Sequence, residues 1–181
     1  MRIVAGAYGG RRIAAPSGAT TRPTSDRVRE ALFSVLGPLH DHVVLDLFAG
    51  SGALGLEALS RGAQRAVFVE SDGWALATLR ANVAGLGLPD DRAIVRAGDA
   101  ALLARDAAAR AEAYDLVFLD PPYRLAAGLG VALGATLPGL LAPGARVVTE
   151  SPRRAPMELT DLPLTQERRY GDTLIRIHTA P

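Results

Sequence analysis

The sequence contains no cysteine and no lysine, and aromatic residues make up only 5% of it. The absence of cysteine excludes disulfides and thiolate metal sites. No apolar run approaches the roughly 20 residues that a membrane-spanning helix needs, so no membrane partner is expected. The first residues also lack the apolar stretch of a signal peptide, and we therefore expect a cytoplasmic protein.

Charge is nearly balanced over the whole chain but uneven along it. The formal net charge is +1, so bulk charge alone does not predict a nucleic-acid partner. Using arginine for every basic position is also what a genome rich in G and C would produce. The charged residues among the first thirty, however, are mostly basic, with Asp26 and Glu30 as the only acids. Such a local cationic face indicates phosphate contact. Its arginines are Arg2, Arg11, Arg12, Arg22, Arg27 and Arg29.

The 181 residues fit one domain with a substantial core. Residues 2–14 are expected to form a β-hairpin around Tyr8-Gly9-Gly10, followed by a loop. A helix capped by Thr24, Ser25 or Asp26 should then run to Leu36, where Gly37-Pro38 stops it. We expect residues 1–23 to form an extension and residues 24–181 to form the core of the same domain.

The rest of the chain alternates between short apolar runs and helical stretches. This alternation predicts an α/β fold with a mostly parallel, seven-stranded sheet, helices on both faces and an antiparallel C-terminal hairpin. Expected strands are Val43–Leu47, Arg65–Glu70, Ala93–Ala97, Leu116–Leu119, Ala145–Thr149, Thr165–Tyr170 and Thr173–His178. Expected helical stretches are Ala53–Arg61, Gly73–Ala84, Ala101–Ala111 and a Gly-rich one over Leu125–Leu141.

Ligands of such sheets bind at the carboxyl ends of the strands, so the residues that follow each strand are the candidate site. An acid or a Gly-rich loop follows each of the first four expected strands. In chain order these segments are Asp46-Leu47-Phe48-Ala49-Gly50-Ser51-Gly52, then Glu70, then Gly98-Asp99, then Asp120-Pro121-Pro122-Tyr123. The glycines allow a tight turn and close approach of a ligand to the backbone, beside the free N–H groups of a helix start.

A nicotinamide-dependent dehydrogenase is one alternative for this pattern. Residues 50–55 satisfy G-x-G-x-x-G, and Glu70 lies where a ribose-binding acid is expected. Against it, Asp46 would repel a pyrophosphate, the chain is short for a second substrate domain, and Asp-Pro-Pro-Tyr has no role in hydride transfer. We therefore do not favour this alternative.

Together, the motifs resemble those of class I S-adenosylmethionine-dependent methyltransferases. Asp120-Pro121-Pro122-Tyr123 is similar to the (Asn/Asp)-Pro-Pro-(Tyr/Phe/Trp) signature of enzymes that methylate amino groups. More narrowly, residues 22–33 (RPTSDRVREALF) and residues 46–58 (DLFAGSGALGLEA) resemble the 16S rRNA (guanine-N2)-methyltransferase family. The similarity covers nearly the whole chain, and it implies a Rossmann-like fold.

The resemblance implies a role for each strand end in binding S-adenosylmethionine. Glu70 would accept hydrogen bonds from both ribose hydroxyls, because a carboxylate offers two oxygens. Asp99 would accept from the adenine amino group, and Asp46 would attract the methionine ammonium. A solvated acid at Glu70 and a simple Gly-Asp turn at Asp99 are the alternatives. The full expected cofactor set is Asp46, Phe48, Ala49, Gly50, Ser51, Gly52, Glu70, Ser71, Asp99 and Ala100.

The Asp-Pro-Pro-Tyr loop would carry the chemistry. An exocyclic amine is a poor nucleophile because its lone pair is delocalised into the base. Asp120 and the Pro121 carbonyl would accept its two N–H bonds and aim the lone pair at the methyl group, while Pro121 and Pro122 stiffen the loop. Tyr123 would stack on the extruded base. A rigid turn without catalytic function is the alternative.

The expected partner is 16S rRNA within the assembling small subunit, bound by a monomer without a metal. Arg2, Arg11, Arg12, Arg22, Thr24 and Arg27 are the candidate RNA contacts. We expect removal of residues 1–15 to leave the sheet folded; alternatively, the hairpin covers a core face. His40, His42 and His178 form no ligand cluster. Trp74 is expected to pack helix against sheet, with stacking on adenine as the alternative. Adenine-N6 methylation of DNA or RNA, and a non-enzymatic RNA-binding role in ribosome assembly, remain as other functions.

Overall fold

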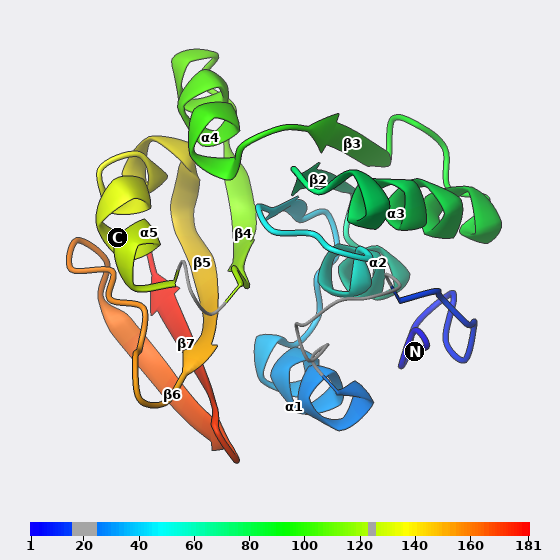
Figure 1. The fold of residues 1–181 in the computed structure, drawn as a ribbon, viewed down its shortest axis with the longest axis horizontal. Coiled ribbons are helices and arrows are strands. Elements are labelled where there is room, and N and C mark those ends of the chain that lie inside the picture. Colours follow the sequence, from blue (N-terminus) through cyan, green and yellow to red (C-terminus); the bar gives the residue numbers. More distant parts are fainter. Residues whose placement is uncertain (16–24, 123–125) are drawn as a thin grey trace.

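The computed structural model of the protein describes residues 1–15, 25–122 and 126–181 (Figure 1). Seven strands form one sheet in the order β3-β2-β1-β4-β5-β7-β6. The strands are β1 (Val43–Asp46), β2 (Arg65–Glu70), β3 (Ala93–Ala97), β4 (Tyr114–Leu119), β5 (Leu141–Pro152), β6 (Leu164–Tyr170) and β7 (Thr173–Thr179). The helices are α1 (Asp26–Leu36), α2 (Ala53–Ser60), α3 (Gly73–Leu86), α4 (Ala100–Ala109) and α5 (Ala126–Gly134), followed by the 3-10 turn η1 (Leu137–Leu140).

Strands β1 to β5 are parallel to one another, and β7 is antiparallel to both β5 and β6. This confirms the mostly parallel sheet with an antiparallel C-terminal hairpin. The first strand, β1, lies inside the sheet. The next two strands extend the sheet outward to β3, and the chain then returns to place β4 on the other side of β1. The switch in strand order therefore lies between β1 and β4, where open α/β sheets bind their ligands.

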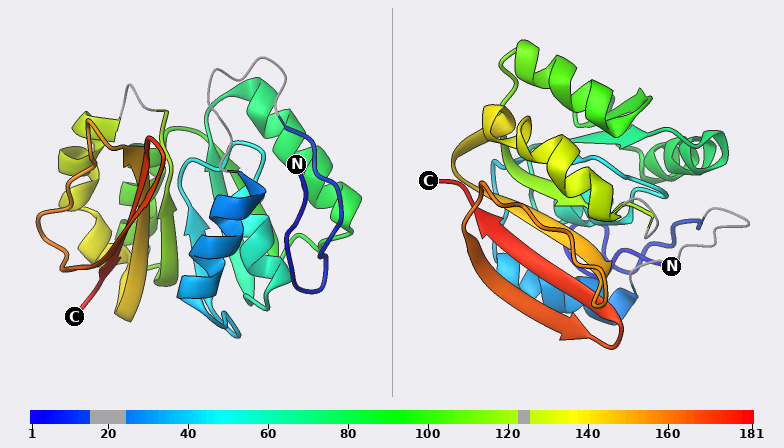
Figure 2. Two further views of the ribbon diagram at one scale, coloured as in Figure 1. Left: turned by 90° about the horizontal axis from the view of Figure 1, so that it is seen from below. Right: turned by 60° about the vertical axis from the view of Figure 1, so that its left-hand side comes forward.

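Helices cover both faces of the sheet. Figures 1 and 2 show α1, α2 and α3 on one face and α4 and α5 on the other. Alternate residues of the buried strands supply the two cores: Val44 and Phe68 point to the first face, whereas Leu45 and Val67 point to the second. Because both faces are covered, the central residues of these strands are apolar on both sides instead of alternating with polar residues.

The N-terminal extension folds as the expected hairpin and lies against α2 and α3 (Figure 2). Arg2 and Arg12 form an antiparallel bridge, and the N–H of Ile3 bonds to the carbonyl of Arg11 at 2.9 Å. Ile3 and Ile13 are buried in the core that α1, α2 and α3 cover. The hairpin thus completes one face of the core, which is the alternative to a separable RNA-docking arm.

Two local expectations were wrong. The Gly-rich stretch does not form one helix to Leu141, because Pro138 lacks the N–H that a continued helix requires; α5 ends at Gly134 and η1 follows. Trp74 does not pack helix against sheet: it lies in the first turn of α3 with 75% of its surface exposed. Within the described residues, no helix has both the length and the apolar character that would let it cross a bilayer.

Candidate active site at the carboxyl edge of the sheet

The loop after β1 has a backbone shape that only glycine adopts easily. Gly50 and Gly52 have φ values of 54° and 85°, in the left-handed region. A Cβ on Gly52 would lie 2.5 Å from Leu79, so the loop packs closely on α3, whereas a Cβ on Gly50 would meet open space. The sheet side of the loop is fixed by Ala49, whose N–H donates to the Val69 carbonyl at 3.0 Å. The open side of Gly50 is where a ligand can approach the backbone.

Asp46 ends β1 beneath this loop and is only 1% exposed. Its Oδ2 accepts the N–H of Gly55 at 3.1 Å, whereas no group within the described residues bonds to its Oδ1. Burial, with a smaller contribution from the negative charge of Glu70, raises the pKa of Asp46 to about 7, although hydrogen bonds from the backbone act in the opposite direction. A buried carboxylate oxygen without a partner is costly, and a cationic ligand group would offset that cost.

Glu70 ends β2 and fastens the glycine loop to the neighbouring strand. Its Oε2 accepts the N–H of Gly50 at 2.8 Å, and its Oε1 accepts the N–H groups of Ser71 and Asp72, both at 2.8 Å. Each carboxylate oxygen can accept about two hydrogen bonds. Oε1 is therefore already used within the chain, while Oε2 retains capacity for one further donor, fewer than the two ribose bonds expected from the sequence.

Asp99 follows β3 as the N-cap of α4, which begins at Ala100. Its Oδ1 accepts the N–H groups of Ala101 and Leu102 at 2.9 and 3.0 Å. Gly98, with φ 153°, turns the chain just before it. Asp99 is thus a helix-capping residue, a role that neither the cofactor interpretation nor the Gly-Asp turn predicted, and it is exposed at the same edge as Glu70. Its other oxygen takes no part in the cap hydrogen bonds.

The Asp120 loop follows β4, next to β1. Asp46 pairs with Phe118 in the parallel register, so Asp120 lies two residues beyond the level of Asp46. Pro121 is buried and Pro122 is half-buried, which anchors the loop on the sheet. Tyr123 lies outside the described residues, so its predicted stacking position stays a prediction.

The fold therefore brings the four strand ends together along one edge, in the order Asp99, Glu70, the glycine loop and Asp120. The group offers carboxylate oxygens, an open glycine backbone and an uncompensated buried acid. These features fit a ligand with a cationic end, hydroxyl groups and an amine-bearing ring. Asp120 lies on the far side of the glycine loop from Asp99 and Glu70, at the switch in strand order.

Only part of the predicted RNA face is described, because Arg22 and Thr24 lie outside the described residues. Arg2, Arg11, Arg12 and Arg27 are exposed. Arg2 pairs with Asp26 at 3.3 Å, and Arg11 donates to the carbonyl of Gly85 at 2.6 Å. Arg29, by contrast, is fully buried, donating to Asp26 and to the carbonyl of Arg2. It holds the hairpin on α1 and does not belong to the cationic surface.

Three buried polar residues near the site were not found from the sequence. Glu57 is 0% exposed and accepts the N–H groups of Val4 and Ala5 at 2.6 and 3.1 Å. The Ser60 hydroxyl donates to the Ala5 carbonyl and accepts the N–H of Tyr8. Asn82 bonds to the glycine loop and to the hairpin. In the sequence, Glu57 and Ser60 stand out as the polar residues of the otherwise apolar stretch Ala53–Ser60, whereas Asn82 shares its stretch with other polar residues and gives no such signal.

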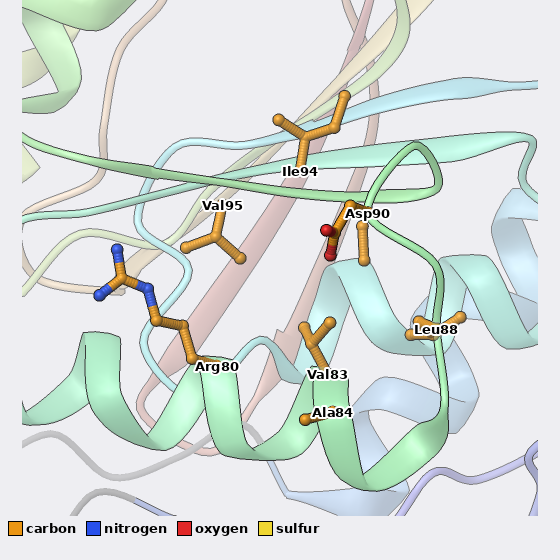
Figure 3. A pocket seen from close by; sticks show the side chains of 8 residues that line it. Arg80, Val83, Ala84, Leu88, Asp90, Ile94 and Val95 are labelled. Atoms are coloured by element: carbon orange, nitrogen blue, oxygen red, sulfur yellow. The ribbon is translucent and has the colours of Figure 1, made fainter.

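A cavity of about 560 Å³ lies elsewhere, between α3 and the edge strand β3 (Figure 3). Arg80 and Val83 extend from α3 toward Val95, with Asp90 at the other end. None of the strand-end residues lines it, so it is distinct from the candidate site. In the described part of the chain, no group of three or more His, Asp or Glu side chains is arranged to hold a metal ion.

The model of the family described as conserved hypothetical protein 95 matches residues 1–179. The chain belongs to that family. The putative rRNA methyltransferase YlbH of Bacillus subtilis (strain 168) is 36% identical over 181 residues, covering 98% of both chains. Ribosomal RNA small subunit methyltransferase D of Escherichia coli (strain K12) is 42% identical over 125 residues. That alignment covers 68% of this chain and 61% of the relative, less than two thirds of its length.

Solved structures have the same fold over nearly the whole chain. The putative methyltransferase yhhF from Escherichia coli has a TM-score of 0.81 and 35% identity, covering 99% of this chain and 97% of the other. An RNA methyltransferase from Salinibacter ruber, in complex with S-adenosyl-L-homocysteine, has a TM-score of 0.65 and 21% identity over 88% of this chain and 94% of the other. The second likeness concerns the fold alone. Together they confirm the class I methyltransferase fold expected from the sequence.

Proposed function

We propose that this chain transfers a methyl group from S-adenosylmethionine to the exocyclic N2 of a guanine in 16S rRNA of the small ribosomal subunit. The observation that carries the proposal is the meeting of four strand ends at one edge of the sheet, with the Asp120 loop beside the glycine loop. Family membership and relatives named as rRNA methyltransferases support it.

The residues of the site match the chemical groups of the cofactor. Asp46 would face the methionine ammonium, because its buried Oδ1 lacks a hydrogen-bond partner within the described residues. Glu70 would bind the ribose through Oε2, which retains accepting capacity, and Asp99 would accept from the adenine amine through the oxygen not used in its cap. The open side of Gly50 would let the methionine end lie against the backbone.

S-adenosylmethionine, when bound, supplies an electrophilic methyl carbon on a sulfonium. Asp120 and the Pro121 carbonyl would hold the two N–H bonds of the base amine and direct its lone pair at that carbon. Methyl transfer from the sulfonium to the amine nitrogen would leave a neutral thioether, and Asp120 would accept the proton that the methylated amine must lose. Tyr123 would stack on the base.

The test is nucleoside mass spectrometry on small-subunit rRNA from a strain that lacks the gene. We expect N2-methylguanosine to fall at one position and to be restored by the wild-type gene but not by Asp120→Ala. Loss of N6-methyladenosine instead would identify an adenine methyltransferase. Unchanged rRNA nucleosides together with no binding of S-adenosylmethionine would favour a non-enzymatic role in ribosome assembly.

A further inference from the structure

Asn82 is the only asparagine of the chain, and it lies inside α3 with 6% of its surface exposed. Its Nδ2 donates to the Ser51 carbonyl at 2.9 Å and to the Ala14 carbonyl at 3.0 Å. Its Oδ1 accepts the N–H of Ala14 at 2.8 Å. Both hydrogens of the amide and its oxygen are therefore used, and they join segments that are 31 and 68 residues away.

The two segments that meet at Asn82 have different positions in the molecule. Ser51 is the middle of the glycine loop, between two residues with positive φ. Ala14 follows Ile13 at the end of the second arm of the hairpin. A second contact joins the same parts, because the Ser51 hydroxyl lies 3.5 Å from Sδ of Met1. The hairpin thus touches both the side chain and, through Asn82, the backbone of Ser51.

The glycine loop has other restraints within its own turn, where the N–H of Gly52 donates to the Ala49 carbonyl at 2.7 Å, and on the side of the sheet. Its sheet side is held by Ala49 and Gly50, which bond to the end of β2. Glycine backbones lose the most conformational freedom when they are ordered, so a loop of this composition needs fixed partners to keep one shape. On the α3 side, the bond from Asn82 to the Ser51 carbonyl supplies that restraint.

We propose that Asn82 is a positioning residue that sets the shape of the glycine loop and couples it to the N-terminal hairpin. The proposal rests on the proposed function, since the glycine loop is taken to bind S-adenosylmethionine. It implies that the hairpin contributes to cofactor binding through Asn82, in addition to any contact of its arginines with RNA. No other side-chain type of this size offers two donors and one acceptor in this arrangement.

The first experiment compares Asn82→Ala and the isosteric Asn82→Asp with Ser60→Ala. Asn82→Asp keeps an acceptor for the Ala14 N–H but turns a second acceptor toward two carbonyls. Ser60→Ala is the matched control, because it removes two hairpin bonds to α2 without touching the loop. All are measured well below their melting temperatures. We expect the Kd and KM for S-adenosylmethionine to rise about tenfold or more in both Asn82 variants, the scale of one lost buried hydrogen bond or more.

Ser60→Ala should change the cofactor Kd by less than about twofold, even if its melting temperature falls as far as those of the Asn82 variants. The positioning role is wrong if Ser60→Ala weakens cofactor binding as strongly as the Asn82 variants do at an equal loss of stability. It is also wrong if both Asn82 variants bind the cofactor with a Kd within twofold of wild type. If wild-type protein binds no S-adenosylmethionine, the proposed function fails instead.

The second experiment starts from the wild-type protein, so its main comparison does not depend on a variant that folds. Amide hydrogen exchange of the free wild-type protein should find the Ala14 N–H protected together with the N–H groups of Gly50 and Gly52. Saturating S-adenosylmethionine should slow exchange at Ala14 along with the loop, and more than at Tyr8, which bonds to Ser60. Slowed loop amides with unchanged Ala14 would overturn the coupling. In the free protein, Asn82→Asp should speed exchange at Gly52, whatever ligand the site binds.

Discussion

The backbone N–H of Gly50 donates a 2.8 Å hydrogen bond to Oε2 of Glu70, so the loop after β1 is fastened to the end of β2. Glu70 is therefore both a proposed ligand of the cofactor ribose and a restraint on the loop that binds the methionine end. Because the two roles share one side chain, a substitution there alters the shape of the site as well as its hydrogen bonds.

Glu70→Ala is expected to weaken binding of S-adenosylmethionine by about 1.5–3 kcal/mol, the scale of hydrogen bonds to charged groups. Calorimetry on the purified variant measures this. Asp72→Ala is the matched control, since Asp72 is a nearby acid whose Oδ1 caps α3. The control should lose helix stability while keeping cofactor affinity. Wild-type affinity in Glu70→Ala would remove Glu70 from the site.

Asp99→Asn and Asp99→Ala should separate helix capping from ligand binding. Asparagine caps helices about as well as aspartate, whereas alanine costs about 1 kcal/mol. With its oxygen in the cap, asparagine would turn an NH₂ group toward the adenine amine, a donor facing a donor. We expect Asp99→Asn to melt near wild type but to bind S-adenosylmethionine several-fold more weakly. Wild-type affinity in Asp99→Asn would leave Asp99 as a cap only.

Asp120→Ala should reduce turnover by about 100-fold or more, while the affinity for the cofactor stays near that of wild type. The reason is that Asp120 is proposed to hold the target amine and not the cofactor. Asp120→Asn keeps one acceptor oxygen and should retain more activity than Asp120→Ala. Single-turnover methylation and calorimetry on the same preparations measure both quantities. Activity of Asp120→Ala within a few-fold of wild type contradicts the mechanism.

The pH dependence of the free protein should reveal Asp46, whose pKa of about 7 lies above its unfolded value near 3.8. Because the pKa is raised in the folded state, protonation of Asp46 stabilises the fold. This stabilisation is complete below pH about 4 and is lost as the pH rises through about 7. The free energy of unfolding should therefore fall by up to about 4 kcal/mol over this range. Denaturation of wild type and Asp46→Asn at several pH values measures it, and the variant should lack this component.

Cofactor binding should depend on pH in the opposite sense. A ligand ammonium favours ionised Asp46, so affinity for S-adenosylmethionine should rise with pH up to about 7 and then level off. Binding at pH 6 should release protons, which calorimetry in buffers of different ionisation enthalpy detects. Affinity and proton release that do not vary between pH 5 and pH 8 would place the ammonium away from Asp46.

Two kinds of change in the N-terminal region should have different effects. Deletion of residues 1–15 should lower the melting temperature and impair cofactor binding, because it uncovers the core at Ile3 and Ile13 and takes hydrogen bonds from buried Glu57. Replacing both exposed arginines, Arg12 and Arg27, by alanine should leave the melting temperature and cofactor binding nearly unchanged. It should raise the KM for small-subunit substrate and reduce its salt dependence. A stable, cofactor-binding truncation would contradict the packing role.

The alternation of apolar runs and helical stretches predicted the seven strands and the mostly parallel sheet, because helices must cover both faces of such a sheet, but it did not predict the strand order. The glycine and acid pattern placed Asp46, Glu70, Asp99 and Asp120 at strand ends, and parallel strands bring those ends to one edge. Pro138 could also have indicated that the helix over residues 125–141 is interrupted. A continuous helix was nevertheless expected, because Gly-rich apolar segments have little periodicity that would mark a helix end.

Only the tertiary structure decided what surrounds each side chain. In the sequence, Arg29 is one of the N-terminal arginines that were expected to form a cationic surface, but in the structure it is buried under the hairpin. Trp74 is apolar but exposed, and the hairpin packs into the core instead of standing apart. The raised pKa of Asp46 and the three bonds of Asn82 likewise depend on groups far away in the chain. Burial and hydrogen bonding depend on which distant segments come into contact, and local sequence patterns do not show those contacts.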